Sequence, residues 1–344
     1  MLTFQKLCDA YLASLQGRPS ARRYRQVYRQ HLQPWGSHFA HDLTRRQILK
    51  FQQERPMPLE QMRKALGLIR QAYKWAGRTL NPVTDDLYYG GPNPAIGLQI
   101  TPADSRERLA SHEELIKILR ELPYLHPRHA AFFAVRLTAP SRIAELDATE
   151  PGHFRRCEMV PGYPGAAIWS KYITKNGKAQ NIYVAPQAMK YLDALPWSGK
   201  YFFQGAHGQH WTEGTARKAW WELMAHLNIG TDCPRHCQKH DSDARQKPCQ
   251  CLQLLDIRRT LASYLYRLHR RQDVDDLTIK ALLNHYDGRP VAIYTRLDLE
   301  YLSKILQGYA DWLWNLPGTI PEPEGRLDLV PPLDEDAELM EVPG

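Results

Sequence analysis

The sequence has 344 residues, of which 43% are hydrophobic and 24% charged, and its formal net charge is +8. This length suits two domains that each bury a core, and the excess of lysine and arginine favours a polyanionic partner. No apolar run approaches the roughly 18 residues of a membrane span, and the N-terminal residues lack a signal-peptide pattern, so we expect a cytoplasmic protein with no membrane partner and with reduced cysteines.

Apolar side chains recur at helical spacing in the N-terminal part, which predicts helices over residues 7–15, 20–32, 44–55 and 59–80. Basic side chains share one face of the second helix and one face of the fourth, where they could hold DNA phosphates. They are Arg22, Arg25, Arg29, Arg63, Arg70 and Lys74. A solvated basic surface would give the same pattern, so both interpretations stay open.

A non-periodic segment rich in glycine and proline, residues 81–107, predicts an interdomain linker with a boundary near residue 100. Beyond it, Ser111 and Glu114 have the spacing of a capping box. This pair predicts the start of a helix over residues 111–122.

The helical pattern of residues 129–148 is interrupted at Pro140, which should kink or split the helix just before Arg142. Two short apolar stretches then predict strands, and the Asn-Gly between them is a strong hairpin signal. The strands and their connection are residues 167–170, 179–184 and 175–178. Further helices are predicted over residues 215–227, 255–271, 276–283, 289–297 and 299–316. The expected fold class is therefore mainly α with a small β-hairpin or sheet (α+β).

Residues 317–344 read as an acidic tail rich in proline, for which we predict disorder. Within residues 319–344, eight acids stand against Arg326 alone, so this stretch carries −7 and the rest of the chain carries +15. The positive charge is thus concentrated in the parts expected to fold.

Three side chains late in the sequence suit phosphoryl transfer to a phenol. Arg258 and His285 can donate hydrogen bonds to a phosphate, and Tyr294 follows that histidine by nine residues. A phosphotyrosine ester would keep the energy of a broken phosphodiester bond, which hydrolysis would lose. The pattern therefore predicts cutting and rejoining of nucleic acid.

With Arg142 and Glu145 three positions later, these motifs make residues 106–316 resemble the catalytic domain of the tyrosine recombinases, or phage integrases. Residues 1–98 look like the helical core-binding domain that precedes it in that family, and residues 99–105 would be the linker. The resemblance implies a site-specific DNA recombinase that acts through a 3′-phosphotyrosyl intermediate to integrate or excise a mobile element. It implies double-stranded DNA with specific sites as partner, a homo-tetramer on that DNA, and no cofactor for the chemistry; an accessory protein is a further candidate partner.

The resemblance also implies roles for single residues. Tyr294 would be the nucleophile, Arg142 and Arg258 would bind the scissile phosphate, and His285 would buttress that phosphate site. Supporting roles fall to Glu145 and Asp256. A guanidinium stays charged at any working pH and can donate two hydrogen bonds to one phosphate, which suits the first of these roles.

Two positions leave alternatives open. Lys175 is the implied general acid, with Lys171 and Lys178 as rivals, because a lysine with a tunable pKa can protonate the leaving 5′-oxygen. Leu255 stands where the family has histidine, so either an upstream histidine takes over or the chain is a catalytically silent DNA-binding regulator. The upstream candidates are His236 and His240. A DNA-relaxing activity of the type IB topoisomerase kind is the rival among enzymes.

The last predicted helix carries an apolar stripe made by Leu302, Leu306, Tyr309 and Leu313. The helix after the nucleophile docks on a neighbouring subunit in the family, so this stripe is a candidate for that contact. Packing against the chain's own core is the equal alternative.

A polar segment at residues 233–251 lies outside the family pattern and gathers cysteines and histidines at two- and three-residue spacing. Such side chains can converge on zinc, which could stabilise an insertion without an apolar core. The candidate ligands are Cys233, His236, Cys237, His240, Cys249 and Cys251. A structural zinc site and a loop of unligated thiols are both open at this point.

Overall fold

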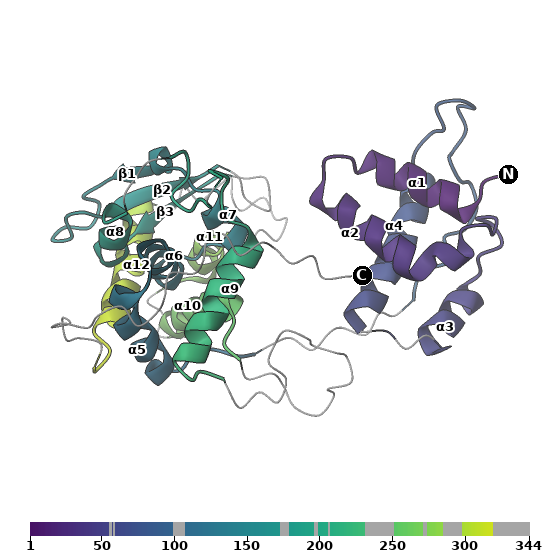
Figure 1. Cartoon of the computed structure of the whole chain (residues 1–344). Helices are drawn as coiled ribbons and strands as arrows, with labels where there is room; N and C mark the ends of the chain where they lie inside the picture. Colours follow the sequence, from purple (N-terminus) through teal and green to yellow (C-terminus); the bar gives the residue numbers. More distant parts are fainter. Residues whose placement is uncertain are drawn as a thin grey trace. The chain divides into compact units, whose positions relative to one another are not determined.

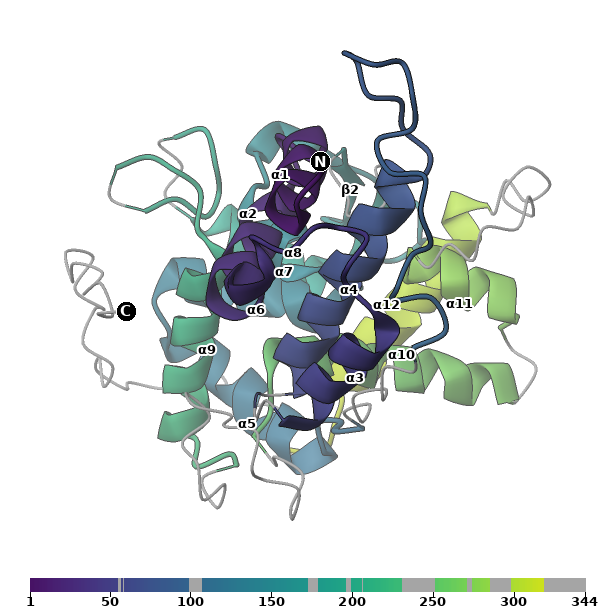
Figure 2. The ribbon, with the colours of Figure 1, turned by 90° about the vertical axis from the view of Figure 1, so that its right-hand side faces the viewer.

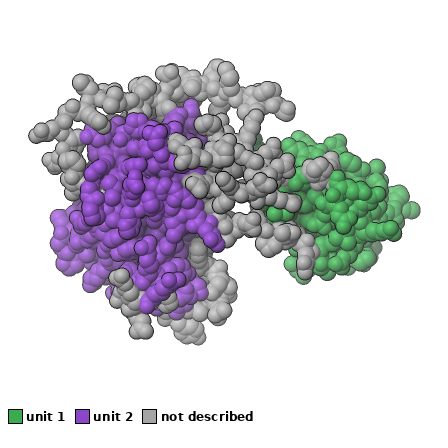
Figure 3. Space-filling view, turned by 90° about the horizontal axis from the view of Figure 1, so that it is seen from below, with its two compact units in different colours: residues 1–106, 238–248 green, residues 107–237, 249–344 purple. Residues whose placement is uncertain are grey.

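The computed structural model describes residues 1–54, 57, 59–98, 107–172, 179–195, 199–205, 207–230, 251–270, 274–284 and 298–318. These residues fall into two compact units, one within residues 1–98 and one within residues 107–318, coloured green and purple in Figure 3. Most of them are helical and a small antiparallel sheet lies in the second unit, so the predicted fold class is confirmed. In the described part of the chain, no helix is long and apolar enough to cross a membrane.

The first unit contains the predicted α-helices (Figure 1). Their bounds are α1 Phe4–Ser14, α2 Pro19–Val27, α3 Arg45–Glu54 and α4 Leu59–Ala76. Both α1 and α2 pack against α4, and their apolar faces meet in one core that includes Phe4, Leu66 and Tyr73. The amphipathic spacing in the sequence is thus sufficient to explain this bundle.

The second helix differs from its predicted extent of residues 20–32. After Val27 the backbone widens into a π-helix over Tyr28–Leu32, followed by a 3₁₀ turn over Gln33–Trp35. Pro34 lies in that turn, and because proline has no N–H to donate, the helix ends there.

The expected linker is, up to Leu98, part of the first unit. After α4 the chain makes an irregular excursion, visible in Figure 2, with an isolated bridge between Leu80 and Leu87. It then returns to α4, where the Asn93 side chain donates to the carbonyl of Arg70 at 3.0 Å and Ala95 is fully buried. Residues 81–98 therefore pack as part of the first unit, which loop composition does not reveal, and residues 99–106 lie outside the described residues.

The second unit is built around α6, which lies in its middle with the sheet, α8 and α10 around it (Figure 1). The helices are α5 His112–Glu121, α6 Pro127–Thr138, α7 Ile143–Asp147, α8 Pro186–Asp193, α9 Glu213–His226, α10 Leu254–Arg270, α11 Asp276–Leu282 and α12 Leu299–Trp314. Short 3₁₀ turns span Leu122–Tyr124 and Pro151–His153. The predicted capping box begins α5, since the Ser111 N–H donates to Glu114 at 2.8 Å and the Glu114 N–H donates to Ser111 Oγ at 3.2 Å.

The sheet has the order β1-β2-β3, with bounds Phe154–Arg156, Ala167–Lys171 and Gln180–Val184. Strands β2 and β3 pair antiparallel from Ala167 opposite Val184 to Lys171 opposite Gln180, which confirms the two predicted strands. Their predicted connection, residues 175–178, lies outside the described residues. Neither β1 nor α8 was predicted.

The apolar stripe of α12 is used within its own unit. Leu306, Tyr309 and Leu313 are almost fully buried, and Leu302 packs partly buried against the same core. Tyr183 on β3 donates from its hydroxyl to Gln307 Oε1 at 2.6 Å, which fixes α12 against the sheet. Of the two alternatives that the sequence left open, the structure therefore supports packing against the chain's own core, because β3 and α6 cover this stripe.

Candidate active site

The turn between α6 and α7 presents the first predicted arginine. Pro140 splits the predicted helix, so that α6 ends at Thr138 and α7 begins after Arg142, the N-cap residue. Glu145 accepts from the Arg142 backbone N–H at 2.9 Å and from its Nη1 at 2.7 Å. The supporting role predicted for Glu145 thus has a physical form: one carboxylate fixes both the main chain and the guanidinium of Arg142.

Lys171, at the end of β2, completes this arrangement. Its Nζ lies 3.1 Å from Glu145 Oε2, and the two side chains are only 1% and 3% exposed. Strand alternation places Lys171 on the same face as Ala167 and Trp169, which are both buried. Of the three lysines considered as general acid, Lys171 is the one that the described residues include.

Burial sets the ionisation of this pair. It lowers the pKa of Lys171 to about 8, with Glu145 opposing the shift and the positive charges of Arg258 and Arg142 adding to it. Burial also opposes ionisation of Glu145, but Lys171 and the hydrogen bonds from Arg142 outweigh it and hold the pKa of Glu145 below its usual range. Glu145 is therefore a carboxylate at neutral pH.

The second predicted arginine, Arg258, joins three segments. From α10 it donates through Nη1 to the carbonyl of Pro140 at 3.3 Å and through Nη2 to the carbonyl of Leu283, just after α11. It is 7% exposed, and burial followed by the nearby charge of Arg142 lowers its pKa to about 10, so it stays protonated at neutral pH. The fold therefore brings Arg142 and Arg258 together from positions far apart in the sequence.

Asp256, predicted as a supporting residue, fixes the start of α10 through its hydrogen bonds. Asp256 is fully buried, accepts from the Gln253 N–H at 2.8 Å and pairs with Arg259 at 2.7 Å. Leu255, directly before Asp256, is 48% exposed. An imidazole could therefore occupy the position of Leu255 without entering the core.

Sequence reasoning missed Arg136 and Gln180. Arg136 on α6 is 2% exposed and donates to Leu254, in the first turn of α10, while Gln180 on β3 donates to the carbonyls of Ala281 and Leu282 at 2.8 and 3.2 Å. For Arg136 a signal existed, because a charged residue inside an otherwise apolar helix is rarely buried without a partner. For Gln180 no local pattern indicates partners about a hundred residues away.

The chemistry of this cluster follows from its charges. Arg136, Arg142, Arg258 and Lys171 bring four cationic side chains together, and Glu145 is the carboxylate that bonds to two of them. The cations outnumber that carboxylate, so the cluster is suited to an anion with several oxygens, such as a phosphate diester. Because hydrogen bonds hold the guanidinium groups in place, little reorganisation is needed when charge develops on that anion.

The remaining predicted catalytic residues, Lys175, His285 and Tyr294, lie outside the described residues. The chain reaches the last two through Asn284, which has a positive φ of 49° directly after the carbonyl that Arg258 holds. Their roles therefore stay predictions.

The basic residues predicted on α2 and α4 behave differently from one another. Arg22, Arg25 and Lys74 are exposed, and so is Arg29 in the π-helix. Arg63 is partly exposed and lies 3.5 Å from Glu60. Arg70 is partly buried and donates to the carbonyls of Ala95 and Leu98 at 3.4 and 2.8 Å, so these two donors hold the returning chain, and its DNA contact stays a prediction.

Of the six predicted zinc ligands, five lie outside the described residues: Cys233, His236, Cys237, His240 and Cys249. The thiol of Cys251 is partly buried and lies 3.5 Å from the carbonyl of Gly230. Within the described ranges no group of three or more side chains could hold a metal ion. The structural zinc site stays a prediction.

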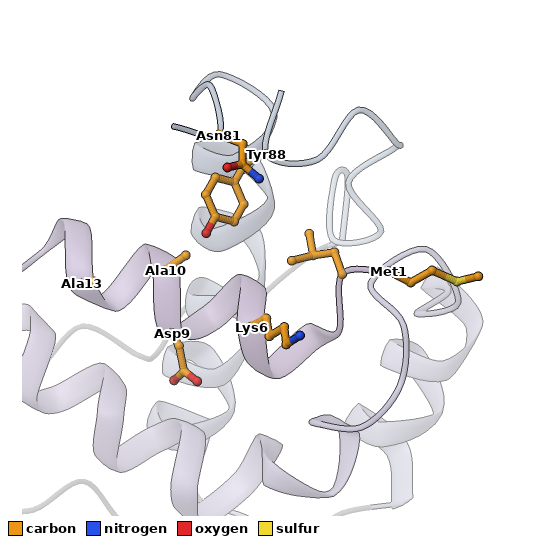
Figure 4. A pocket seen from close by; sticks show the side chains of 8 residues that line it. Met1, Lys6, Asp9, Ala10, Ala13, Asn81 and Tyr88 are labelled. Carbon is orange, nitrogen blue, oxygen red and sulfur yellow. The ribbon is translucent and has the colours of Figure 1, made fainter. Parts of the chain in front are cut away.

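A pocket lies on the first unit, between α1 and the segment after α4 (Figure 4). Lys6 and Asp9 of α1 line it together with Asn81 and Tyr88. Among the described residues, its lining contains no arginine, so it lacks the guanidinium groups that mark the arginine cluster of the second unit.

Neither a family model nor a curated protein sequence matches this chain. Solved structures of similar fold do exist. A lambda integrase dimer bound to a COC′ core site has a TM-score of 0.56 at 12% identity, and the match covers 87% of this chain and 100% of that chain. The Tn1549 transposon integrase in complex with transposon right end DNA has a TM-score of 0.55 at 13% identity, with 89% and 98% covered. The XerH site-specific recombinase bound to a palindromic difH substrate has a TM-score of 0.51 at 13% identity, with 86% and 76% covered.

Proposed function

We propose that this chain, which has the fold of the tyrosine recombinases, is a site-specific DNA recombinase that cleaves and rejoins duplex DNA. The observation that carries the proposal is the pair Arg142 and Arg258, buried or half-buried side by side and each held by hydrogen bonds. A general DNA-binding protein needs exposed cations but gains nothing from such fixed ones.

In the proposed reaction Tyr294 releases its phenol proton to water, its oxygen attacks the scissile phosphorus, and the bond to the 5′-oxygen breaks. The products are a 3′-phosphotyrosyl ester and a 5′-hydroxyl, which takes its proton from Lys175. Arg142 and Arg258 bind the non-bridging oxygens, and His285 buttresses the phosphate. Attack by a 5′-hydroxyl of a partner strand on the same phosphorus then releases Tyr294 and reseals the DNA.

The proposed assembly is a homo-tetramer on two duplexes. The exposed arginines of the first unit would hold phosphates beside the cleavage site, while side chains that meet base edges would select the sequence. Similarity to lambda integrase and to a transposon integrase supports integration or excision of a mobile element as the biological role. An accessory protein that bends or bridges the sites is a further proposed partner.

Leu255 supports a second candidate function, a DNA-binding regulator of the same fold without cleavage. The family histidine at this position aids proton transfer and phosphate binding, and leucine can do neither. A regulator would keep the arginines as phosphate ligands and form no covalent adduct.

Covalent capture separates the two candidates. We expect the wild-type chain, incubated without added divalent metal with nicked duplexes randomised around the nick, to form an adduct that survives denaturation, and Tyr294→Phe to form none. Peptide mass spectrometry should place the nucleotide on Tyr294. Adduct on another residue, or equal adduct from Tyr294→Phe, would contradict the proposed nucleophile.

Leu255→His sharpens this test because the position is half exposed and tolerates an imidazole. We expect this variant to form adduct about 10-fold faster than wild type, since a positioned acid–base group contributes at least that much. If the wild type forms none and Leu255→His does, the native chain is the regulator. If neither forms adduct while both bind DNA, the recombinase proposal fails.

A further inference from the structure

Arg136 is a buried cation for which the proposed reaction has no role so far. It lies on α6 within a stretch, Ala130–Thr138, in which every residue is buried. Only 2% of Arg136 is exposed, and burial, with the nearby charge of Arg258, lowers its pKa to about 10, so the side chain remains charged at neutral pH. A buried charge is costly unless hydrogen bonds compensate for its lost hydration.

The hydrogen bonds of Arg136 reach two segments that carry the phosphate-binding arginines. Nη1 donates to the carbonyl of Ser141 and to its Oγ at 3.2 Å, directly before Arg142. Nη2 donates to the carbonyl of Leu254 at 2.7 Å, one helical turn before Arg258. One guanidinium therefore ties the turn that presents Arg142 to the start of the helix that presents Arg258.

The acceptors are uncharged, which matters for the site. Glu145 and Asp147 influence Arg136 only through space, and the hydrogen bonds that it makes in the described structure go to carbonyls and a hydroxyl. Because no carboxylate bonds to it, Arg136 adds positive charge behind the site as well as fixing its geometry. An apolar residue of similar length would fill the same space but could neither join the segments nor contribute that charge.

We propose that Arg136 is a positioning residue that sets the separation of Arg142 and Arg258 by bonding to the chain before each. This inference rests on the proposed function for its catalytic consequence, whereas the bracing itself is a property of the protein without DNA. The two parts can therefore be tested separately.

The bracing is tested by hydrogen exchange of the full-length protein without DNA. We expect Arg136→Met to speed amide exchange about 10-fold or more in the turn at Ser141 and in the first turn of α10 together, because both lose the same anchor. Arg128→Met is the matched control: it lies on the same helix and donates to the carbonyl of Gln204, and it should leave both segments unchanged. Unchanged exchange in Arg136→Met, or a change in one segment alone, overturns the bracing.

The catalytic consequence is tested by single-turnover adduct formation at saturating DNA. We expect Arg136→Met to reduce the cleavage rate constant about 100-fold, which is the effect of misplacing a reacting geometry by about 1 Å, with DNA affinity within about 3-fold of wild type. Arg136→Lys keeps the charge but can reach only one segment, so it should recover about 10-fold of that loss. If Arg136→Met does not fold, the cleavage rate of Arg136→Lys is compared with wild type instead.

A wild-type rate in a folded Arg136→Met, or an equal loss in Arg128→Met, overturns the positioning role. If the wild-type chain forms no adduct, the proposed function fails instead, and binding of inorganic phosphate then decides whether Arg136 positions the two arginines. Weaker phosphate binding by Arg136→Met than by Arg128→Met supports the inference in that case, and equal binding overturns it.

Discussion

Two sets of arginines, one in each unit, are used in opposite ways. In the first unit Arg22, Arg25 and Arg29 are exposed on α2 and the π-helix that continues it. In the second unit Arg136 and Arg258 are 2% and 7% exposed and donate to main-chain carbonyls. The same residue type thus provides an exposed charge in the first set and a buried, hydrogen-bonded donor in the second.

The difference corresponds to two tasks. Exposed guanidinium groups attract phosphates at long range, tolerate any sequence and are screened by salt. Fixed and desolvated ones act over short distances, where a small displacement changes the rate of a reaction rather than the affinity for DNA. We therefore expect salt to change the DNA affinity that the exposed arginines provide. Small displacements of the buried arginines should instead change the rate of cleavage.

Arg258→Lys should have the largest effect, because it removes a buried, fixed guanidinium and keeps the charge. A lysine keeps the charge but cannot donate to the carbonyls of Pro140 and Leu283 and to a phosphate at the same time. We expect single-turnover adduct formation to fall about 1,000-fold, or about 4 kcal/mol of transition-state stabilisation. DNA affinity should change by less than about 3-fold because the charge is retained.

The neighbouring residue provides the control for that experiment. Arg259 pairs with Asp256 and its side chain is 34% exposed, so Arg259→Lys retains both charge and pairing. It should cleave within about 3-fold of wild type. A comparable loss in both variants would mean that α10 as a whole, and not the fixed donor, is sensitive to change.

Two buried carboxylates on α7 differ in their hydrogen bonds, and one of them should make stability depend on pH. Glu145 is bonded to Arg142 and Lys171, whereas Asp147 is 2% exposed and its Oδ1 has no hydrogen-bond partner in the described structure. Burial, together with the negative charge of Glu213, raises the pKa of Asp147 to about 7 from an ordinary 3.8. The folded protein therefore holds a proton on Asp147 that the unfolded chain releases between these two values.

This proton makes stability fall as pH rises. The contribution of Asp147 is fully present below about pH 4 and is lost progressively as the pH rises to about 7, above which the folded state must bury an ionised carboxylate. Asp147→Asn stays neutral, so we expect its stability relative to wild type, measured by urea unfolding, to be about 3 kcal/mol greater at pH 8 than at pH 5, which corresponds to the two pH units between pH 5 and 7. Asp193→Asn, which alters a half-exposed pair with Arg156, should change stability by less than about 0.5 kcal/mol at both values. The same gain at pH 5 and pH 8 would contradict the explanation.

The sequence was informative where the physics is local. Pro140 predicted the split between α6 and α7, and Asn-Gly predicted the antiparallel pairing of β2 with β3. The motif spacing also indicated Arg142 and Arg258, and the structure brings these two together. In each case the determining residues lie within a few positions of the feature or match a known pattern.

The features that the sequence did not reveal are either too short to show a pattern or depend on partners far away in the sequence. Strand β1 has three residues, too few to show alternation, and α8 is a short helix that begins at Pro186. The donors of Arg70 meet carbonyls 25 and 28 residues further on, which helical periodicity cannot reveal. Burial of Lys171 could have been inferred, because it shares a strand face with Trp169.

Arg25 and Arg70 test which arginines of the first unit contact DNA, and the expected effects are the smallest. Arg25 is exposed on α2, so Arg25→Ala should weaken binding to a random duplex by about 1 kcal/mol and reduce the slope of log affinity against log salt by about 1, which corresponds to one lost phosphate contact. Arg70 is committed to the carbonyls of Ala95 and Leu98, so Arg70→Ala should leave that slope unchanged and lower the free energy of unfolding by about 1 kcal/mol. Fluorescence anisotropy at several salt concentrations and urea unfolding measure both quantities in the same two proteins. An equal reduction in slope for both variants would return Arg70 to the DNA-binding surface, because a side chain that held only its own chain would release no counterions.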